Sequence, residues 1–214
     1  MLTKRIFTVL SMLLFGCADN NFDSYQQFKF LLSGNEEITI SPEAINKLPY
    51  ASAFVTVDNR PRIFVVLAFA ENNRLSWVSS DRGMIVTKHG RITRTLKLDN
   101  DLDYFADSMT DPLFQSSITS GAQFSYSAEW AKNRRSGRSL HSVFRQLADE
   151  YLDINGAIIV TSLYEETVQS IKDGQTWKNY YWLDKKSSLL RKTIQKLGPD
   201  NSTIEMVFTK PYAS

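Results

Sequence analysis

From residue 50 onward, apolar and polar residues alternate in short runs that are separated by turn residues. In the segment 123–130, Phe124, Tyr126, Ala128 and Trp130 occupy alternate positions, with polar residues between them. A period of two is typical of a strand with one buried face. Further runs rich in Val, Ile, Phe and other strand-favouring residues predict strands at 51–57, 62–71, 74–79, 84–88, 91–98, 157–170, 177–183, 189–197 and 202–209.

Short segments rich in turn-forming residues join these runs. They lie at 58–61, 71–73, 81–83, 89–90, 173–174, 184–187 and 198–201. Connections this short are typical of hairpins between antiparallel strands. We therefore predict a mainly β fold, with a single antiparallel β domain built as an open half-barrel or a sandwich and with short helices near the N-terminus.

Some segments depart from the strand pattern. Residues 142–153 carry apolar residues at a helical period, but the neighbouring strands favour a long hairpin arm, so we predict a strand and keep a helix as the alternative. Residues 102–105 suggest a helical turn. Short helices are predicted at 25–32 and after Ser41, where Ser41 would cap the helix and Pro42 would occupy its first turn.

The N-terminus has the pattern of a secretory leader. Lys4 and Arg5 precede the apolar segment 6–15. At about 1.5 Å per residue this segment extends about 15 Å, which is half of the ~30 Å hydrocarbon core of a bilayer. The segment is therefore too short to span a membrane, and we expect residues 1–16 to be removed as a signal peptide.

The end of the leader resembles a bacterial lipoprotein signal, since Leu14 and Gly16 precede Cys17, although Phe15 departs from the usual small residue. Cys17 is the single cysteine of the chain. An unmodified thiol would be a liability in an oxidising compartment, and lipidation, for example with palmitate, removes it. The alternative is a plain secreted protein with a free thiol.

We therefore predict a lipid attached to Cys17, a tether at 17–24 and one β-rich domain at 25–214. In enteric bacteria an Asp directly after the lipidated cysteine would indicate retention at the inner membrane. Here Ala18 takes that place and Asp19 follows it. The outer membrane is therefore favoured, with the domain facing the periplasm.

Charge excludes one class of partner. The formal net charge is +2 and includes Lys4 and Arg5, so the mature chain has a net charge of about zero. Nucleic acid binding needs a concentrated basic face, and we predict none. The basic cluster at 132–138 is interpreted as a solvated loop, with a contact to lipid phosphate or acidic polysaccharide as the alternative.

Chemistry-bearing residues do not form a convincing active site. His89 and His141 lack partners at ligand spacing, so we predict neither a metal site nor a cofactor. The cluster 79–81 has Ser and Asp but no Gly-x-Ser-x-Gly elbow. Glu165 and Glu166 are adjacent on a predicted strand and should point to opposite faces, which rules them out as a paired acid and base. We predict a binding protein and not an enzyme.

Large aromatic residues are the more informative candidates. Trp177 and Tyr181 should share one strand face, while Tyr180 and Trp182 share the other. Such a strand needs cover on both faces, either from the core and an interface or from a ligand such as a sugar. The candidate ligand or partner surface is formed by Trp77, Arg91, Tyr181, Trp182 and Gln195.

Several short segments together resemble one known family. They are Leu-Pro-Tyr-Ala-Ser at 48–52, Trp-Val-Ser-Ser-Asp at 77–81, His-Gly-Arg-Ile at 89–92, Asp-Pro-Leu at 111–113, Asn-Tyr-Tyr-Trp-Leu-Asp at 179–184, Gln195 and Pro199. In this order, behind a lipoprotein leader, they are similar to the YjbF/GfcB family of outer-membrane lipoproteins from group 4 capsule and exopolysaccharide operons.

The resemblance implies a non-enzymatic lipoprotein that assists the assembly or export of a surface polysaccharide. It also implies a mostly antiparallel β fold, with a half-barrel around a helix, and companions that include an outer-membrane β-barrel protein and periplasmic export proteins. No catalytic residues are established for the family, so none are transferred. The alternative function is a carrier of lipid or lipoprotein with an apolar cavity in a half-barrel.

Overall fold

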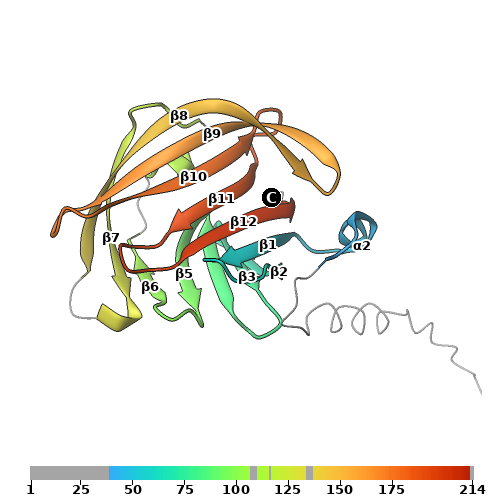
Figure 1. Cartoon of the computed structure of the whole chain (residues 1–214), viewed down its shortest axis with the longest axis horizontal. Coiled ribbons are helices and arrows are strands. Elements are labelled where there is room, and N and C mark those ends of the chain that lie inside the picture. Colours follow the sequence, from blue (N-terminus) through green and yellow to red (C-terminus); the bar gives the residue numbers. More distant parts are fainter. Residues whose placement is uncertain (1–38, 107–109, 116, 134–136, 213–214) are drawn as a thin grey trace, which may run out of the picture.

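The computed structural model describes residues 39–106, 110–115, 117–133 and 137–212. In this part of the chain, one antiparallel sheet of 12 strands curls into a nearly closed barrel (Figure 1). The predicted fold class is thereby confirmed. The predicted signal peptide at 1–16, the lipid site Cys17, the tether at 17–24 and the helix at 25–32 lie outside the described residues.

The elements follow the predicted runs closely. They are α2 (Pro42–Lys47), β1 (Ser52–Val57), β2 (Ile63–Glu71), β3 (Arg74–Val78), β4 (Met84–Lys88), β5 (Arg91–Leu96), β6 (Leu102–Phe105), η1 (Pro112–Phe114), β7 (Gln123–Trp130), η2 (Ala131–Asn133), β8 (Arg138–Ile154), β9 (Ala157–Ser170), β10 (Thr176–Asp184), β11 (Leu190–Lys196) and β12 (Thr203–Lys210).

Strand order shows how the barrel closes. The order in the sheet is β5-β4-β3-β2-β1-β12-β11-β10-β9-β8-β7-β6, so nearly every strand pairs with its neighbours in sequence, and the β1–β12 pair joins the two halves. The edge strands β5 and β6 contact one another. At this seam Thr95 Oγ1 accepts a hydrogen bond from the Leu102 amide at 2.9 Å and donates to Asp101 Oδ1 at 2.9 Å.

The barrel interior is filled by side chains. Trp77 is almost fully buried, packs on Phe208 with ring centroids 5.4 Å apart, and donates from Nε1 to Thr87 Oγ1 at 2.9 Å. A smaller cluster contains Leu113, Ile118, Phe144 and Tyr181. The single α-helix of the described residues, α2, contacts β12 from outside the sheet and not from within it (Figure 1). The implied arrangement of a half-barrel around a helix is therefore not what the described residues form.

The structure settles three local predictions. Residues 102–105 form β6 and not a helical turn, because Leu102 and Tyr104 pair with β7. Residues 142–153 belong to β8, which pairs with β9 along the hairpin, so the strand interpretation is confirmed. His141 lies within β8. The helix after Ser41 is confirmed, with Ser41 Oγ accepting from the Ala44 amide at 3.2 Å.

The β8–β9 hairpin extends beyond its neighbours as an arm that reaches toward β12 (Figure 1). Its tip is fastened by Asn155 Nδ2, which donates to the Thr209 carbonyl at 3.3 Å. Glu150 on the arm accepts a hydrogen bond from Trp182 Nε1 at 2.8 Å. Among the described residues, no helix is long and apolar enough to cross a bilayer.

Candidate functional site

A buried group of polar residues lies inside the barrel and joins segments that are far apart in sequence. We call it the Arg91 cluster; its members are Arg91, Asp111, Glu166, Asn179, Tyr181 and Gln195. Arg91 begins β5 directly after the β4–β5 turn, and Asp111 caps η1. Glu166 faces inward from β9, and the remaining members come from β10 and β11.

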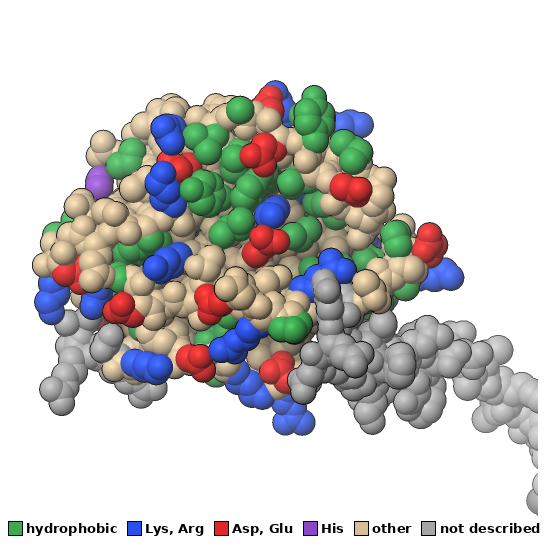
Figure 2. All heavy atoms as spheres, in the orientation of Figure 1, with side chains coloured by type: hydrophobic (Ala, Val, Ile, Leu, Met, Phe, Trp, Pro, Cys, Tyr) green, Lys and Arg blue, Asp and Glu red, His purple; other side chains and the backbone are tan. Residues whose placement is uncertain are grey.

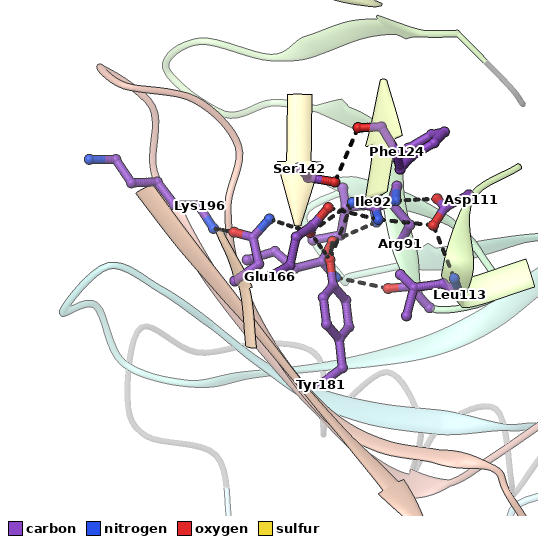
Figure 3. Close-up of polar contacts among 12 residues, drawn as sticks. Arg91, Ile92, Asp111, Leu113, Phe124, Ser142, Glu166, Tyr181 and Lys196 are labelled. Carbon is purple, nitrogen blue, oxygen red and sulfur yellow. Dashed lines mark hydrogen bonds and ion pairs between the residues drawn. The ribbon is translucent and has the colours of Figure 1, made fainter. Parts of the chain in front are cut away.

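Arg91 lies between two carboxylates, as Figure 3 shows. Its Nη2 donates to Asp111 Oδ1 at 3.0 Å, and Nε also contacts the Asp111 carboxylate. Nη1 and Nη2 donate to the two Glu166 oxygens, each at 3.0 Å. The planar guanidinium can satisfy two carboxylates with forked hydrogen bonds, which an ammonium group cannot do.

Further hydrogen bonds link this ion pair to the barrel wall. Tyr181 OH donates to Glu166 Oε2 at 2.9 Å, and Asn179 Nδ2 donates to the same oxygen at 3.0 Å. Gln195 bridges to β5: its Oε1 accepts from the Ile92 amide at 3.0 Å, and its Nε2 donates to the Gly90 carbonyl at 2.8 Å. The cluster therefore ties the free edge of β5 to the opposite side of the barrel.

Burial and charge act against each other in the cluster. Burial disfavours the charged form of Glu166, but the Arg91 guanidinium and the hydrogen bonds to the carboxylate outweigh it and lower the pKa of Glu166. Burial likewise opposes the charge on Arg91, whereas Asp111 and Glu166 raise its pKa above the usual value. Burial raises the pKa of the Tyr181 hydroxyl. The cluster thus contains a stable ion pair.

This arrangement favours a positioning role. A general acid needs a raised pKa and access to a substrate, whereas Glu166 is fully buried and held ionised. Asp111 Oδ1 also accepts from the Leu113 amide at 3.0 Å, so Arg91 fixes the start of η1. Leu113 in turn lines a cavity at the adjacent end of the barrel.

That cavity has a volume of about 310 Å³ and an apolar lining. Among the described residues that line it there is no Asp, Glu, Lys or Arg; the larger apolar side chains are Leu75, Trp77, Leu113, Leu183, Leu189, Leu190 and Phe208. Trp77 also lines a second cavity of about 190 Å³ that is bordered by the opposite ends of β1 to β5. Trp77 therefore lies between the two cavities and contributes to the wall of each.

The structure buries all five candidate residues, none of them more than 6% exposed. Arg91, Tyr181 and Gln195 meet in the Arg91 cluster, and Trp77 lies between the two cavities. Trp182 is on the outer face, beneath the arm. In this state the five side chains do not form an exposed surface, and their role in ligand binding stays a prediction.

Both faces of β10 are covered, as the large aromatic residues on each face require. Trp177 belongs to the barrel core, while Trp182 hydrogen-bonds to the arm. Lys192 Nζ lies 5.1 Å from the centroid of the Trp182 ring and forms an ion pair with Glu205 at 3.2 Å. Figure 2 shows hydrophobic side chains gathered on this face over β10 to β12, with acidic and basic groups between them.

Two important residues were not found as site candidates from the sequence. Asp111 appeared only within the family-like segment 111–113, and Glu166 was considered only as half of an adjacent acidic pair. The expected opposite orientation of that pair is confirmed, since Glu165 pairs with Arg145 at 3.0 Å while Glu166 pairs with Arg91. The feature of the sequence that could have identified Glu166 is its position on the same strand face as the apolar residue Val168, which is buried.

The remaining polar groups are in ordinary surroundings. Ser79 Oγ donates to the Asp81 carboxylate at the β3–β4 turn. Ser79 is buried there, whereas Asp81 is exposed. His89 packs on Phe114 with ring centroids 4.8 Å apart. Within the described ranges, no group of three or more His, Cys, Asp or Glu residues is arranged to hold a metal ion.

Comparison with known proteins gives a consistent result. A family model described as "Group 4 capsule polysaccharide lipoprotein gfcB, YjbF" matches residues 25–208. The chain is 31% identical over 208 residues to the uncharacterized lipoprotein GfcB of Escherichia coli K12, covering 96% of this chain and 97% of GfcB. It is 26% identical over 204 residues to the E. coli K12 lipoprotein YjbF, covering 94% and 95% of the two chains.

A solved structure shares the fold. The crystal structure of the hypothetical lipoprotein YmcC from E. coli K12 superposes with a TM-score of 0.78 at 29% sequence identity. The match covers 90% of this chain and 96% of YmcC. The barrel described here is therefore similar to an experimentally determined one.

Proposed function

Because the chain belongs to the YjbF/GfcB family of group 4 capsule polysaccharide lipoproteins, we propose that it assists the assembly or export of a capsule or exopolysaccharide by binding. The observation that carries this proposal is that the family model spans residues 25–208, which include β1 to β11 and most of β12. In the Arg91 cluster the two carboxylates are paired and buried, an arrangement that favours a stable scaffold over acid–base chemistry.

The proposed location is the periplasmic side of the outer membrane. Cys17 would carry the lipid, and each buried methylene adds about 0.8 kcal/mol, so an anchor with more than one acyl chain is durable. The tether would keep the barrel close to the membrane and raise its effective concentration for a partner there. The proposed partners are the polysaccharide and an outer-membrane β-barrel or periplasmic export protein.

Complementation of a deletion strain tests this function. Wild-type protein should restore surface polysaccharide, whereas C17S should restore little, because it lacks the lipid anchor. Both proteins must be present in the periplasm at equal levels, measured by immunoblot after fractionation. Full restoration by C17S would contradict the need for an anchor, and normal polysaccharide in the deletion strain would contradict the function itself.

A lipid or lipoprotein carrier is the second candidate, and the uncharged apolar lining of the 310 Å³ cavity favours it. Its volume lies at the lower end of the range for small-molecule sites, which suggests that part of an acyl or prenyl chain could enter. Mass spectrometry of lipids that remain bound to the purified protein tests this candidate. L113W, which would fill the cavity, should abolish a specific lipid signal; an unchanged signal would contradict the carrier function.

A further inference from the structure

The outer wall of the barrel carries a groove on the other side of the sheet from the side chains of the Arg91 cluster. It has a volume of about 410 Å³ and crosses β2 to β6. Phe69 on β2 and Tyr104 on β6 both line it, and they are 63% and 53% exposed. At about 4.8 Å between neighbouring strands, the groove spans about 19 Å across the sheet.

Phe69 reaches the outer wall because β2 contains a bulge. Val65 and Leu67 point into the barrel core, so regular alternation would also point Phe69 inward. The pairing with β3 instead shifts between Leu67 and Phe69, which leaves Ala68 as the extra residue. After this shift Phe69 pairs with Ser76 and faces outward.

Tyr104 is turned outward in the same way. Leu102 pairs with Trp130, and both belong to the core. The register then shifts, so that Asp103 is the extra residue and Tyr104 pairs with Glu129 on the outer face. Phe105 returns to the interior and is buried. Two separate bulges therefore present an aromatic ring at each end of one groove.

In β2 this presentation works against the hydrophobic effect, because full burial of a side chain such as Phe contributes about 1.5–3 kcal/mol and a regular strand would have pointed Phe69 inward. In β6 the shift exchanges two aromatic residues, since it turns Tyr104 outward and Phe105 inward. Bulges are frequent next to functional sites, where they re-aim a side chain. Arg94 on β5, which pairs with Val86, lies in the same groove. The two bulges in β2 and β6 therefore turn both rings toward one groove, which favours a site.

The groove floor supplies hydrogen-bonding groups of both kinds. Ser76 and Val86 are register neighbours and form a low floor between the two rings. Arg94 offers donors and Glu71 offers acceptors, while Arg74 and Asp103, which also take part in other contacts, border the groove beside them. These four groups have no net formal charge, which does not favour a polyanion such as nucleic acid.

Building on the proposed function, we propose that this groove binds a segment of the surface polysaccharide. A sugar ring has an apolar face of C–H groups that can stack on an aromatic ring, and a rim of hydroxyls that both donate and accept hydrogen bonds. The two rings would hold sugars at the ends of the segment, and Arg94 and Glu71 would bind hydroxyls between them. An apolar ligand would bury these polar groups without offering them hydrogen bonds, which is unfavourable.

Calorimetric titration tests the assignment. The mature lipoprotein is held in phospholipid nanodiscs and titrated with oligosaccharides released by mild acid from the purified polysaccharide of the producing bacterium. F69A and Y104A should each weaken binding about tenfold, because each removes one stacking surface. Y104F should bind nearly as wild type since it keeps the ring, whereas F69L should not, although it keeps an apolar side chain.

Y151A is the matched control, because Tyr151 is 73% exposed on the arm and does not line the groove. Absence of binding by the wild type, unchanged affinity in F69A and Y104A, or an equal loss in Y151A would each overturn the assignment. Circular dichroism checks that the variants are folded. If the groove variants bind normally while the C17S strain still lacks surface polysaccharide, the groove assignment is wrong but the proposed function stands. If the deletion strain makes normal polysaccharide, the proposed function is wrong, whatever the groove binds.

Discussion

Arg91 is the residue on which the barrel interior most depends. A lone buried charge is expensive, and here one guanidinium compensates two carboxylates that are both fully buried. Five aromatic rings surround its guanidinium carbon at centroid distances between 5.4 and 5.9 Å. This enclosure shields the ion pair from bulk solvent.

R91M should therefore lower the free energy of unfolding by about 3–5 kcal/mol, since Asp111 and Glu166 would remain buried without a counter-charge. R91K should recover only a small part, because an ammonium group cannot form two forked pairs. Urea unfolding of the mature protein carrying C17S, followed by tryptophan fluorescence, measures both effects. Wild-type stability in R91M would show that the cluster contributes little.

The lowered pKa of Glu166 predicts how stability depends on pH. A carboxylate whose pKa is lower in the folded state stabilises the fold above its unfolded pKa, about 4.3 for Glu, and loses this contribution as pH falls through the folded value. Wild-type stability should therefore decline from about pH 4.3 downward. E166Q should show a shallower decline in unfolding free energy over that range, and parallel curves for the two proteins would contradict the assignment.

Among the elements, the turns were predictable in detail and the bulges were not. The β4–β5 turn at His89 and Gly90 was expected from its sequence, and both residues have positive φ. The bulges in β2 and β6 leave no such signal, because Ala68 and Asp103 are unremarkable residues within otherwise regular runs. They are set by pairing with neighbouring strands, as is the conversion of 102–105 from an expected helical turn into β6.

G90A should disturb the β4–β5 turn more than a turn glycine elsewhere. Gly90 has φ of +87°, and a Cβ at this position would lie 2.0 Å from Leu190 Cδ2. Gly156 has a similar φ of +79° but nothing within 4 Å of such an atom, so G156A isolates the backbone cost, about 1 kcal/mol. Thermal unfolding should show a larger loss for G90A; equal losses would mean that Leu190 moves aside freely.

For the whole molecule, alternation and short turns were enough to predict an antiparallel β domain. Closure of the barrel was not predictable in the same way, because it depends on the β1–β12 pair and on side-chain hydrogen bonds at the β5–β6 seam. The candidate residues Arg91, Tyr181 and Gln195 do meet, yet inside the barrel. Strand alternation gives two faces, and only the direction of curvature determines which face becomes the interior.

The central claim for the whole molecule is that a lipid-anchored barrel binds polysaccharide on its outer wall. Its most direct test is surface polysaccharide in a deletion strain that expresses the F69A/Y104A double variant at wild-type level, with Y151A as the control. The double variant should leave the strain as deficient as the deletion, while Y151A should restore it. Full restoration by a folded, membrane-bound F69A/Y104A protein would contradict the account.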